Sequence, residues 1–197
     1  LEPHVPADWT SFAIQNVRVG DAAANFRFTK TADSITLDVR RSGTGDCWLE
    51  FSPAFSLRTQ VQSVKFNGKP VEFKMQPNRD DQHLRLRVRL NGDANDLLIH
   101  MKDDFGVTLT NELPHLGSAS RGLRIMDQSW NSSRTELTLN ISGLADARYE
   151  LGVWNSSQIA SVDGAALNKF GKLEVEMQKG APETYVQQKI VIHFRHS

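Results

Sequence analysis

Residues 84–90 read L-R-L-R-V-R-L, with an apolar side chain at every second position and an arginine at each position between. A period of two places the apolar side chains on one face of a β-strand and the arginines on the other. Strands with one apolar and one polar face are typical of antiparallel sheets, because the strands of parallel sheets are apolar throughout. The same alternation occurs in residues 34–40, 136–141, 172–177 and 188–194.

Turn signals separate these stretches at short intervals. Asn67-Gly68 stands between V-K-F and K-P-V-E-F, and a two-residue hairpin turn needs the positive φ that asparagine and glycine tolerate. Asn91-Gly92 and Asp163-Gly164 are further turn signals, and no amphipathic pattern of three helical turns appears. We therefore predict an all-β fold made of two tandem antiparallel β-sandwich units.

The middle of the chain lacks this alternation. Residues 103–121 read D-D-F-G-V-T-L-T-N-E-L-P-H-L-G-S-A-S-R, which contains glycine, proline and small polar residues. We predict a first β-sandwich over residues 1–105, a connecting segment over 106–120 and a second β-sandwich over 121–197. A chain of 197 residues has room for two small domains.

Composition excludes several classes of partner. The 23 basic and 23 acidic side chains balance, so we expect no nucleic-acid partner. The sequence contains no apolar run of about 18 residues, so we expect no membrane span. One cysteine, Cys47, allows neither an intramolecular disulfide nor a cysteine-based metal cluster. Because the chain begins with Leu1 and not with methionine, we expect a mature or excised piece of a longer protein. Cytoplasmic, periplasmic and secreted locations all remain open.

The residues able to carry chemistry form no recognised motif. The six histidines show no H-x-H or H-E-x-x-H spacing, although a zinc site built from distant strands stays open. The oxygen-rich loops lack the spacing of a calcium loop, and neither a nucleophile elbow nor a phosphate loop is present. No two of the 23 acids stand out as the carboxylate pair of a glycosidase. We predict no catalytic residue, no metal and no cofactor, and therefore a chain that is not itself an enzyme.

Three tryptophans are candidate carbohydrate-binding residues. Trp48 alternates with Leu49 and Phe51, so its side chain is expected to point outward. Trp130 and Trp154 each precede an Asn-Ser-Ser turn, which places them near the rim of a sandwich. Sugar rings stack on flat aromatic faces, but tryptophans at a sandwich edge also serve to cover the core, and this is the more frequent role.

The arginines of residues 84–90 allow two interpretations. Arg85, Arg87 and Arg89 on one strand face offer three guanidinium groups to a phosphate or an acidic sugar. They equally suit ion pairs with carboxylates on a neighbouring strand, or protection of a sheet edge against aggregation. We favour the structural interpretation.

Six stretches of the chain share a recognisable pattern: P-H-V-P-A-D-W (3–9), N-V-R-V-G (16–20), S-V-K-F-N-G-K-P-V (63–71), R-Y-E-L (148–151), V-D-G-A (162–165) and Y-x-x-x-x-I-V-I-H-F (185–194). Together they resemble the accessory β-sandwich regions that follow the catalytic barrel in bacterial glycogen-debranching-like glycoside hydrolases. The resemblance implies that the catalytic carboxylates lie on an α/α barrel that this chain lacks, so no catalytic residue is carried over.

Three hypotheses follow. The first is a non-catalytic accessory region of a larger polysaccharide-processing enzyme, whose partners are the catalytic domain of the parent chain and, secondarily, polysaccharide. It predicts a contiguous apolar surface patch. The second is an autonomous carbohydrate-binding module, which predicts exposed aromatic side chains over a groove. The third is a β-sandwich enzyme, such as a lyase, whose site is not visible in the sequence.

Overall fold

The computed structural model of the chain describes residues 1–109 and 114–195. Every strand pair in these ranges is antiparallel, which confirms the predicted all-β class. The chain divides into two compact units, Leu1–Asp104 and Phe105–Ser197, and each contains two sheets around its own apolar core. Among the described residues, no helix has the length and apolar character needed to span a membrane.

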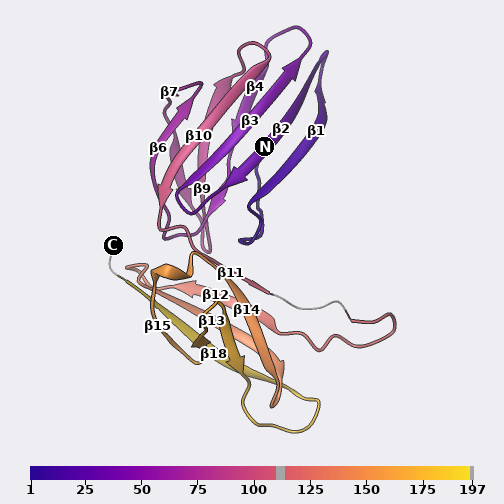
Figure 1. Cartoon of the computed structure of the whole chain (residues 1–197), viewed down its shortest axis with the longest axis vertical. Helices are drawn as coiled ribbons and strands as arrows, with labels where there is room; N and C mark the ends of the chain where they lie inside the picture. The colour runs from indigo at the N-terminus through magenta and orange to yellow at the C-terminus, as the bar shows by residue number, and fades with distance from the viewer. Residues whose placement is uncertain (110–113, 196–197) are drawn as a thin grey trace. The chain divides into compact units, whose positions relative to one another are not determined.

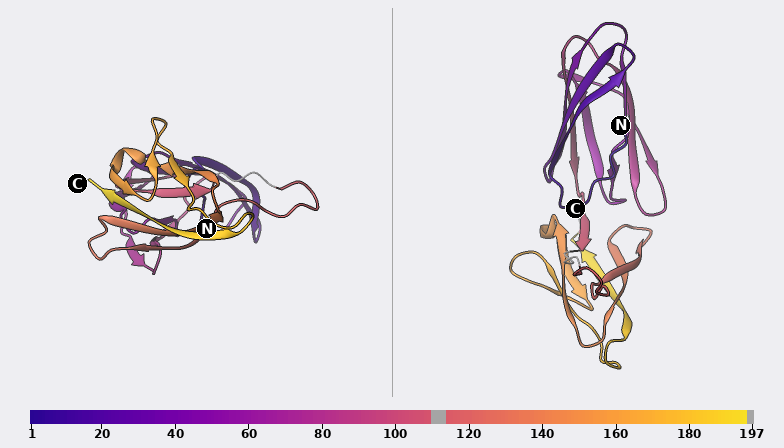
Figure 2. Two further views of the ribbon diagram at one scale, coloured as in Figure 1. Left: turned by 90° about the horizontal axis from the view of Figure 1, so that it is seen from below. Right: turned by 90° about the vertical axis from the view of Figure 1, so that its right-hand side faces the viewer.

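The first unit contains a six-stranded sheet and a smaller sheet. The six-stranded sheet has the order β1 (Ser11–Val19), β2 (Ala22–Lys30), β3 (Ser34–Ser42), β10 (Ala94–Lys102), β6 (Gln60–Phe66) and β7 (Lys69–Pro70), and Figure 1 shows its strands in indigo to magenta. In the smaller sheet, β9 (Gln82–Arg89) pairs with β4 (Trp48–Phe51), β5 (Ala54–Phe55) and β8 (Lys74–Pro77). The right-hand view of Figure 2 shows these layers edge-on.

The predicted apolar face of residues 84–90 lies in the core of the first unit. Leu84 is fully buried, and so are Leu37 of β3 and Ile99 of β10 in the six-stranded sheet. Burial of each side chain of this size contributes about 1.5–3 kcal/mol, so this alternation gives a strong preference for one register. The Asn67-Gly68 hairpin is also confirmed, because both residues have positive φ and Phe66 pairs with Lys69.

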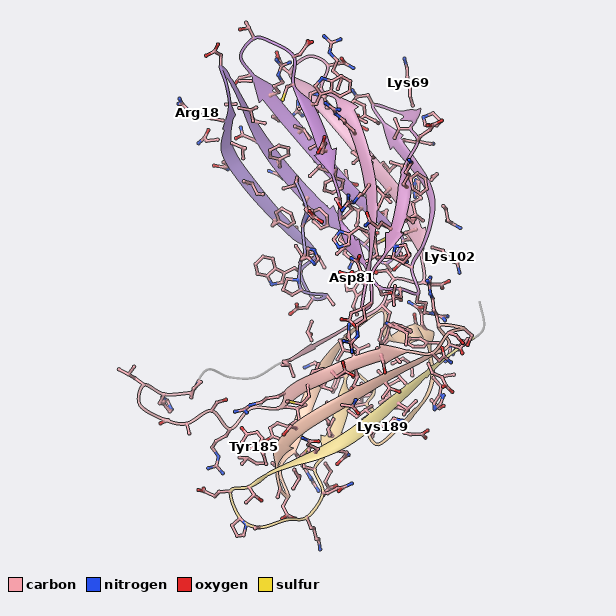
Figure 3. All side chains as sticks on the ribbon, turned by 180° about the vertical axis from the view of Figure 1, so that it is seen from behind. Arg18, Lys69, Asp81, Lys102, Tyr185 and Lys189 are labelled. Atoms are coloured by element: carbon pink, nitrogen blue, oxygen red, sulfur yellow. The ribbon has the colours of Figure 1, made fainter. Side chains whose placement is uncertain are left out.

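The second unit is built from two four-stranded sheets. One has the order β11 (Gly106–Leu109), β14 (Arg148–Trp154), β17 (Leu173–Glu176) and β16 (Ala166–Leu167). The other has the order β12 (Arg124–Trp130), β13 (Glu136–Leu144), β18 (Tyr185–Phe194) and β15 (Ile159–Asp163), and Figure 3 labels Tyr185 and Lys189 on β18. A single 3₁₀ turn, η1 (Ser156–Gln158), precedes β15.

Tyr149 joins three segments of the second unit. Its hydroxyl accepts a hydrogen bond from the backbone N–H of Leu144 at 2.9 Å and donates one to the carbonyl oxygen of Arg121 at 2.9 Å. A tyrosine that bonds back to the backbone shortly upstream is a recurrent feature of immunoglobulin-like sandwiches. Gly143 makes room for the ring, since a Cβ atom at that position would lie 2.6 Å from Cε2 of Tyr149.

Two parts of the chain differ from the sequence analysis. Residues 106–109, which were assigned to the connecting segment, form β11 and pair with β14 of the second unit. The sequence does not predict the long strands β1 and β2. In β1, a bulge between Ile14 and Val17 breaks the period of two. Asn16 has a φ of 59° at this bulge, and its N–H donates to Oδ1 of Asn25 at 2.7 Å.

Candidate functional site

The outer face of the smaller sheet in the first unit contains most of the predicted candidate residues. Arg85, Arg87 and Arg89 of β9 are exposed, whereas Leu86 and Val88 between them are buried. Trp48 of β4 stands directly opposite Arg89 of β9, and its side chain is 52% exposed. We call this surface of β4, β9 and β8 the arginine face.

Two of the three arginines have the carboxylate partners that the structural interpretation expects. Nε of Arg87 lies 3.6 Å from Oε1 of Glu50, its cross-strand partner on β4. Arg89 forms an ion pair with Asp46, just before β4. The guanidinium of Arg87 also lies over the ring of Trp48, with Cζ 4.7 Å from the ring centroid, which is a cation–π arrangement. Half of the tryptophan nevertheless remains exposed.

The third arginine differs from the other two. Arg85 stands directly opposite Lys74 of β8, so two cations share one cross-strand pair. Neither side chain has an ion pair or a hydrogen bond within the part of the chain that the structure describes. Like charges at directly opposed positions destabilise a sheet, so this pair is a poor choice for stability alone. It leaves two cationic groups available to an anion.

Lys74, Arg85 and Arg87 line one open groove of about 600 Å³. The remaining lining residues include Phe73 and the carboxylates Glu2, Glu50 and Glu72. Glu50 forms an ion pair with Arg87, and Oε1 of Glu2 lies 3.3 Å from Nδ1 of His83. The groove thus combines an apolar side chain with charged groups, a mixture found in sites that orient a polar ligand.

Leu1 and Glu2, at the start of the chain, line part of the groove. The carbonyl oxygens of Leu1 and Pro3 accept hydrogen bonds from the backbone N–H groups of Ser52 and Ala54, at 2.9 and 3.3 Å. This extended pairing places Glu2 and His4 on the same side of the chain, because side chains alternate along an extended backbone. Both contact His83 of β9: the rings of His4 and His83 lie 4.7 Å apart.

Among the described residues, a group of three side chains could hold a metal ion: Glu2, His4 and His83. One atom from each side chain lies within 4.8 Å of the others. From the sequence we predict no metal, and only a zinc site assembled from distant strands stays open. His83 lies 81 positions after Glu2 and 79 positions after His4. A local spacing motif therefore cannot reveal this group.

The other two candidate tryptophans belong to the second unit. Trp130 packs on its core: its ring stacks on Phe194 with centroids 5.2 Å apart, and the edge of Phe105 approaches at 6.4 Å. Trp154 ends β14 and is partly buried. Trp130 therefore covers the core of the second unit, whereas the arginine face is made of residues of the first unit.

The second unit has a groove of its own, of about 710 Å³. Glu150 and Glu174 stand directly opposite each other in its lining, and a pair of neighbouring carboxylates is what carboxylate chemistry would require. Each has a separate partner: Lys172 bonds Glu150, and the side-chain amide of Asn168 donates to Glu174 at 2.9 Å. These contacts favour a structural role for both carboxylates.

His193 of β18 is held between two carboxylates. Its Nε2 lies 3.0 Å from Oδ2 of Asp163, and its Nδ1 lies 3.1 Å from Oε1 of Glu136. The hydrogen bond to Asp163, together with both negative charges, raises the pKa of the imidazole above its ordinary value of 6.5. The protonated ring can donate to both neighbours, so this group links β13, β18 and β15 by charge.

No protein-family model matches the chain, and comparison with curated proteins finds no match either. The resemblance to accessory regions of glycogen-debranching-like hydrolases therefore stays a prediction.

Proposed function

We propose that the chain is a non-catalytic, glycan-binding accessory region whose binding site is the groove on the arginine face of the first unit. The observation that supports this most strongly is the cross-strand pair of Lys74 and Arg85, which stand together in the groove without an anionic partner among the described residues. A ligand that supplies negative charge would remove a repulsion that the free protein tolerates.

The proposed ligand is an acidic polysaccharide, with carboxylate groups on its sugar rings. A guanidinium group binds a carboxylate through two parallel hydrogen bonds, and the ammonium group of Lys74 adds a second cation beside it. Trp48 adds an exposed aromatic ring on the same face, where the apolar side of a sugar can stack. An open groove suits a polymer, because a chain can enter and leave at its ends.

The groove of the second unit fits such a ligand less well. Glu150, Glu174 and Glu176 line it together with a single arginine, Arg148, which is already paired with Glu176 at 3.3 Å. These carboxylates would repel an acidic sugar. The proposal therefore assigns binding to the first unit.

Docking onto a catalytic domain is the other part of the accessory-region hypothesis, and it has less support. The exposed large apolar side chains in the described ranges come from separate strands and loops of both units, among them Trp9, Val19, Met126 and Phe170. Glycan binding by the arginine face does not depend on such docking, and it applies equally to an autonomous module.

Calorimetric titration with oligogalacturonates and with neutral malto-oligosaccharides tests the proposal. We expect saturable binding of the acidic oligosaccharides that weakens as salt increases, since exposed charges are screened. Arg85→Ala should weaken it at least tenfold, whereas Arg18→Ala, an exposed arginine on β1 in the other sheet, should leave it unchanged.

A second matched pair tests the aromatic contribution. Trp48→Ala should weaken binding, and Trp9→Ala should not, although the two tryptophans are equally exposed at 52% and 53%. Absence of binding to acidic oligosaccharides, stronger binding of neutral ones, or equal effects of Arg85→Ala and Arg18→Ala would each refute the proposal.

A further inference from the structure

The smaller sheet of the first unit brings together two histidines and two carboxylates from opposite ends of its sequence. Glu2 and His4 come from the extended N-terminal residues, Asp81 from the turn between β8 and β9, and His83 from β9. Figure 3 labels Asp81 near one end of the first unit's strands. The turn fixes Asp81, because the side-chain amide of Asn78 donates to its Oδ1 at 2.9 Å.

His83 is the centre of this group and is only 3% exposed. A buried imidazole requires partners at both nitrogens. Oε1 of Glu2 lies 3.3 Å from Nδ1, and the hydroxyl and carbonyl oxygens of Ser52 lie 3.2 and 3.3 Å from the same nitrogen. Oδ2 of Asp81 lies 3.4 Å from Nε2 on the opposite side of the ring.

These positions give the two carboxylates different roles. One imidazole can offer only one nitrogen to an ion, and Glu2 lies beside Nδ1 while Asp81 lies beside Nε2. With the proton on Nε2 directed to Asp81, Nδ1 carries a lone pair that can bind an ion in place of a hydrogen bond from the Ser52 hydroxyl. A carboxylate that holds the second nitrogen of a metal-binding histidine fixes its tautomer and increases its basicity.

We infer that Glu2, His4 and His83 bind one divalent transition-metal ion of the zinc type, with Asp81 as the residue that orients His83. Two imidazoles and a carboxylate are ligands suited to Zn²⁺, and three protein ligands leave a fourth position open. Ligands of a tetrahedral zinc ion lie about 3.4 Å apart, given bonds of about 2.1 Å. The three candidate atoms lie within 4.8 Å of one another, so small side-chain rotations suffice.

The test uses Zn²⁺ itself and is independent of any glycan. Calorimetric titration of the untagged chain with zinc chloride, in a buffer that does not bind metal, should give one ion per chain with micromolar or tighter affinity. His4→Ala and Glu2→Gln should each weaken uptake at least tenfold, because both side chains are exposed and their loss spares the core. His100→Ala, an exposed histidine on β10, should bind zinc as the unchanged chain does.

His83 needs a test that keeps the residue, because its replacement could unfold the unit. Nitrogen-15 NMR of the histidine side chains should show the resonance of His83 Nδ1 shifting on zinc addition while Nε2 keeps its proton. Absence of saturable zinc uptake would overturn the inference. So would equal zinc affinities of His4→Ala and His100→Ala, or a His83 ring whose nitrogens do not respond to zinc.

Discussion

Lys74 and Arg85 face each other directly across β8 and β9, and neither has an ion pair among the residues that the structure describes. The neighbouring arginines of β9 show that carboxylate partners are easily supplied here, since Arg87 has Glu50 and Arg89 has Asp46. Natural sheets tend to place opposite charges at such positions. The like-charged pair in the groove therefore lowers the stability of the free sheet, and a role in binding an anionic ligand explains why both cations are present.

The first prediction separates stability from binding at this pair. Lys74→Gln removes the repulsion, so the free energy of unfolding of the free protein should stay level or rise by up to about 0.5 kcal/mol. The same change should weaken acidic-oligosaccharide binding several-fold. Chemical denaturation and calorimetry on one preparation measure both. Lys69→Gln, on the exposed strand β7, is the control and should change neither quantity. Lower stability together with unchanged affinity would show that Lys74 has a structural role only.

The second prediction concerns a buried ion pair at the end of the first unit. Nζ of Lys30 lies 2.7 Å from Oδ2 of Asp104, with side chains 9% and 3% exposed, and Thr59 donates to Oδ1 of the same carboxylate at 2.8 Å. Removal of one partner leaves a buried charge uncompensated, so Asp104→Asn should destabilise the first unit by about 3–5 kcal/mol. Hydrogen exchange read by mass spectrometry should show faster exchange in β2 and β10. Asp93→Asn, in an exposed turn, should have no such effect.

The third prediction tests the tyrosine of the second unit. Tyr149→Phe keeps the ring but leaves the N–H of buried Leu144 without its acceptor, which should cost about 1–3 kcal/mol. Gly143→Ala should cost a similar amount through crowding, because its methyl group would overlap the same ring. The changes share one contact, so the double variant should be less destabilised than the sum of the two. Strict additivity would mean that the glycine and the tyrosine act independently.

The fourth prediction is a pH dependence in the second unit. The folded pKa of His193 is raised above 6.5, chiefly by its hydrogen bond to Asp163, so the folded state holds the proton more tightly than the unfolded state does. The stabilisation is fully present below pH 6.5 and is lost as the pH rises through the folded pKa. His193→Gln should therefore destabilise the second unit more at pH 5.5 than at pH 8.5, as measured by thermal unfolding. An equal loss at both values would exclude the proton linkage.

Much of the fold could be predicted from alternation and turn chemistry. Residues 84–89 form most of β9 with the predicted face buried, and the Asn67-Gly68 turn has the expected positive φ angles. The strand β1 was missed because Asn16 interrupts its alternation at a bulge. The strand β11 was missed because only its pairing with β14, 40 or so residues later, makes it a strand. Pairing of this kind depends on tertiary contacts that a local pattern does not contain.

The candidate site was predictable only in part. The alternation of apolar and polar residues along each strand places Arg85 and Trp48 on an outer face. It does not show that Arg85 pairs across the strands with Lys74, or that no carboxylate among the described residues forms an ion pair with Arg85. The group around His83 depends on the N-terminal residues pairing with the segment at Ser52, and this pairing has no sequence signal. Trp130 precedes a polar turn as a rim residue does, yet its ring packs on Phe194 in the core.

NMR titration locates the glycan-binding surface residue by residue. Backbone and indole resonances of the nitrogen-15-labelled chain should be followed while an oligogalacturonate is added. We expect shifts at Lys74, Arg85 and the Trp48 indole, while the resonances of the second unit stay unchanged. Shifts confined to the second unit, or no shifts at saturating oligosaccharide, would refute the proposed binding site.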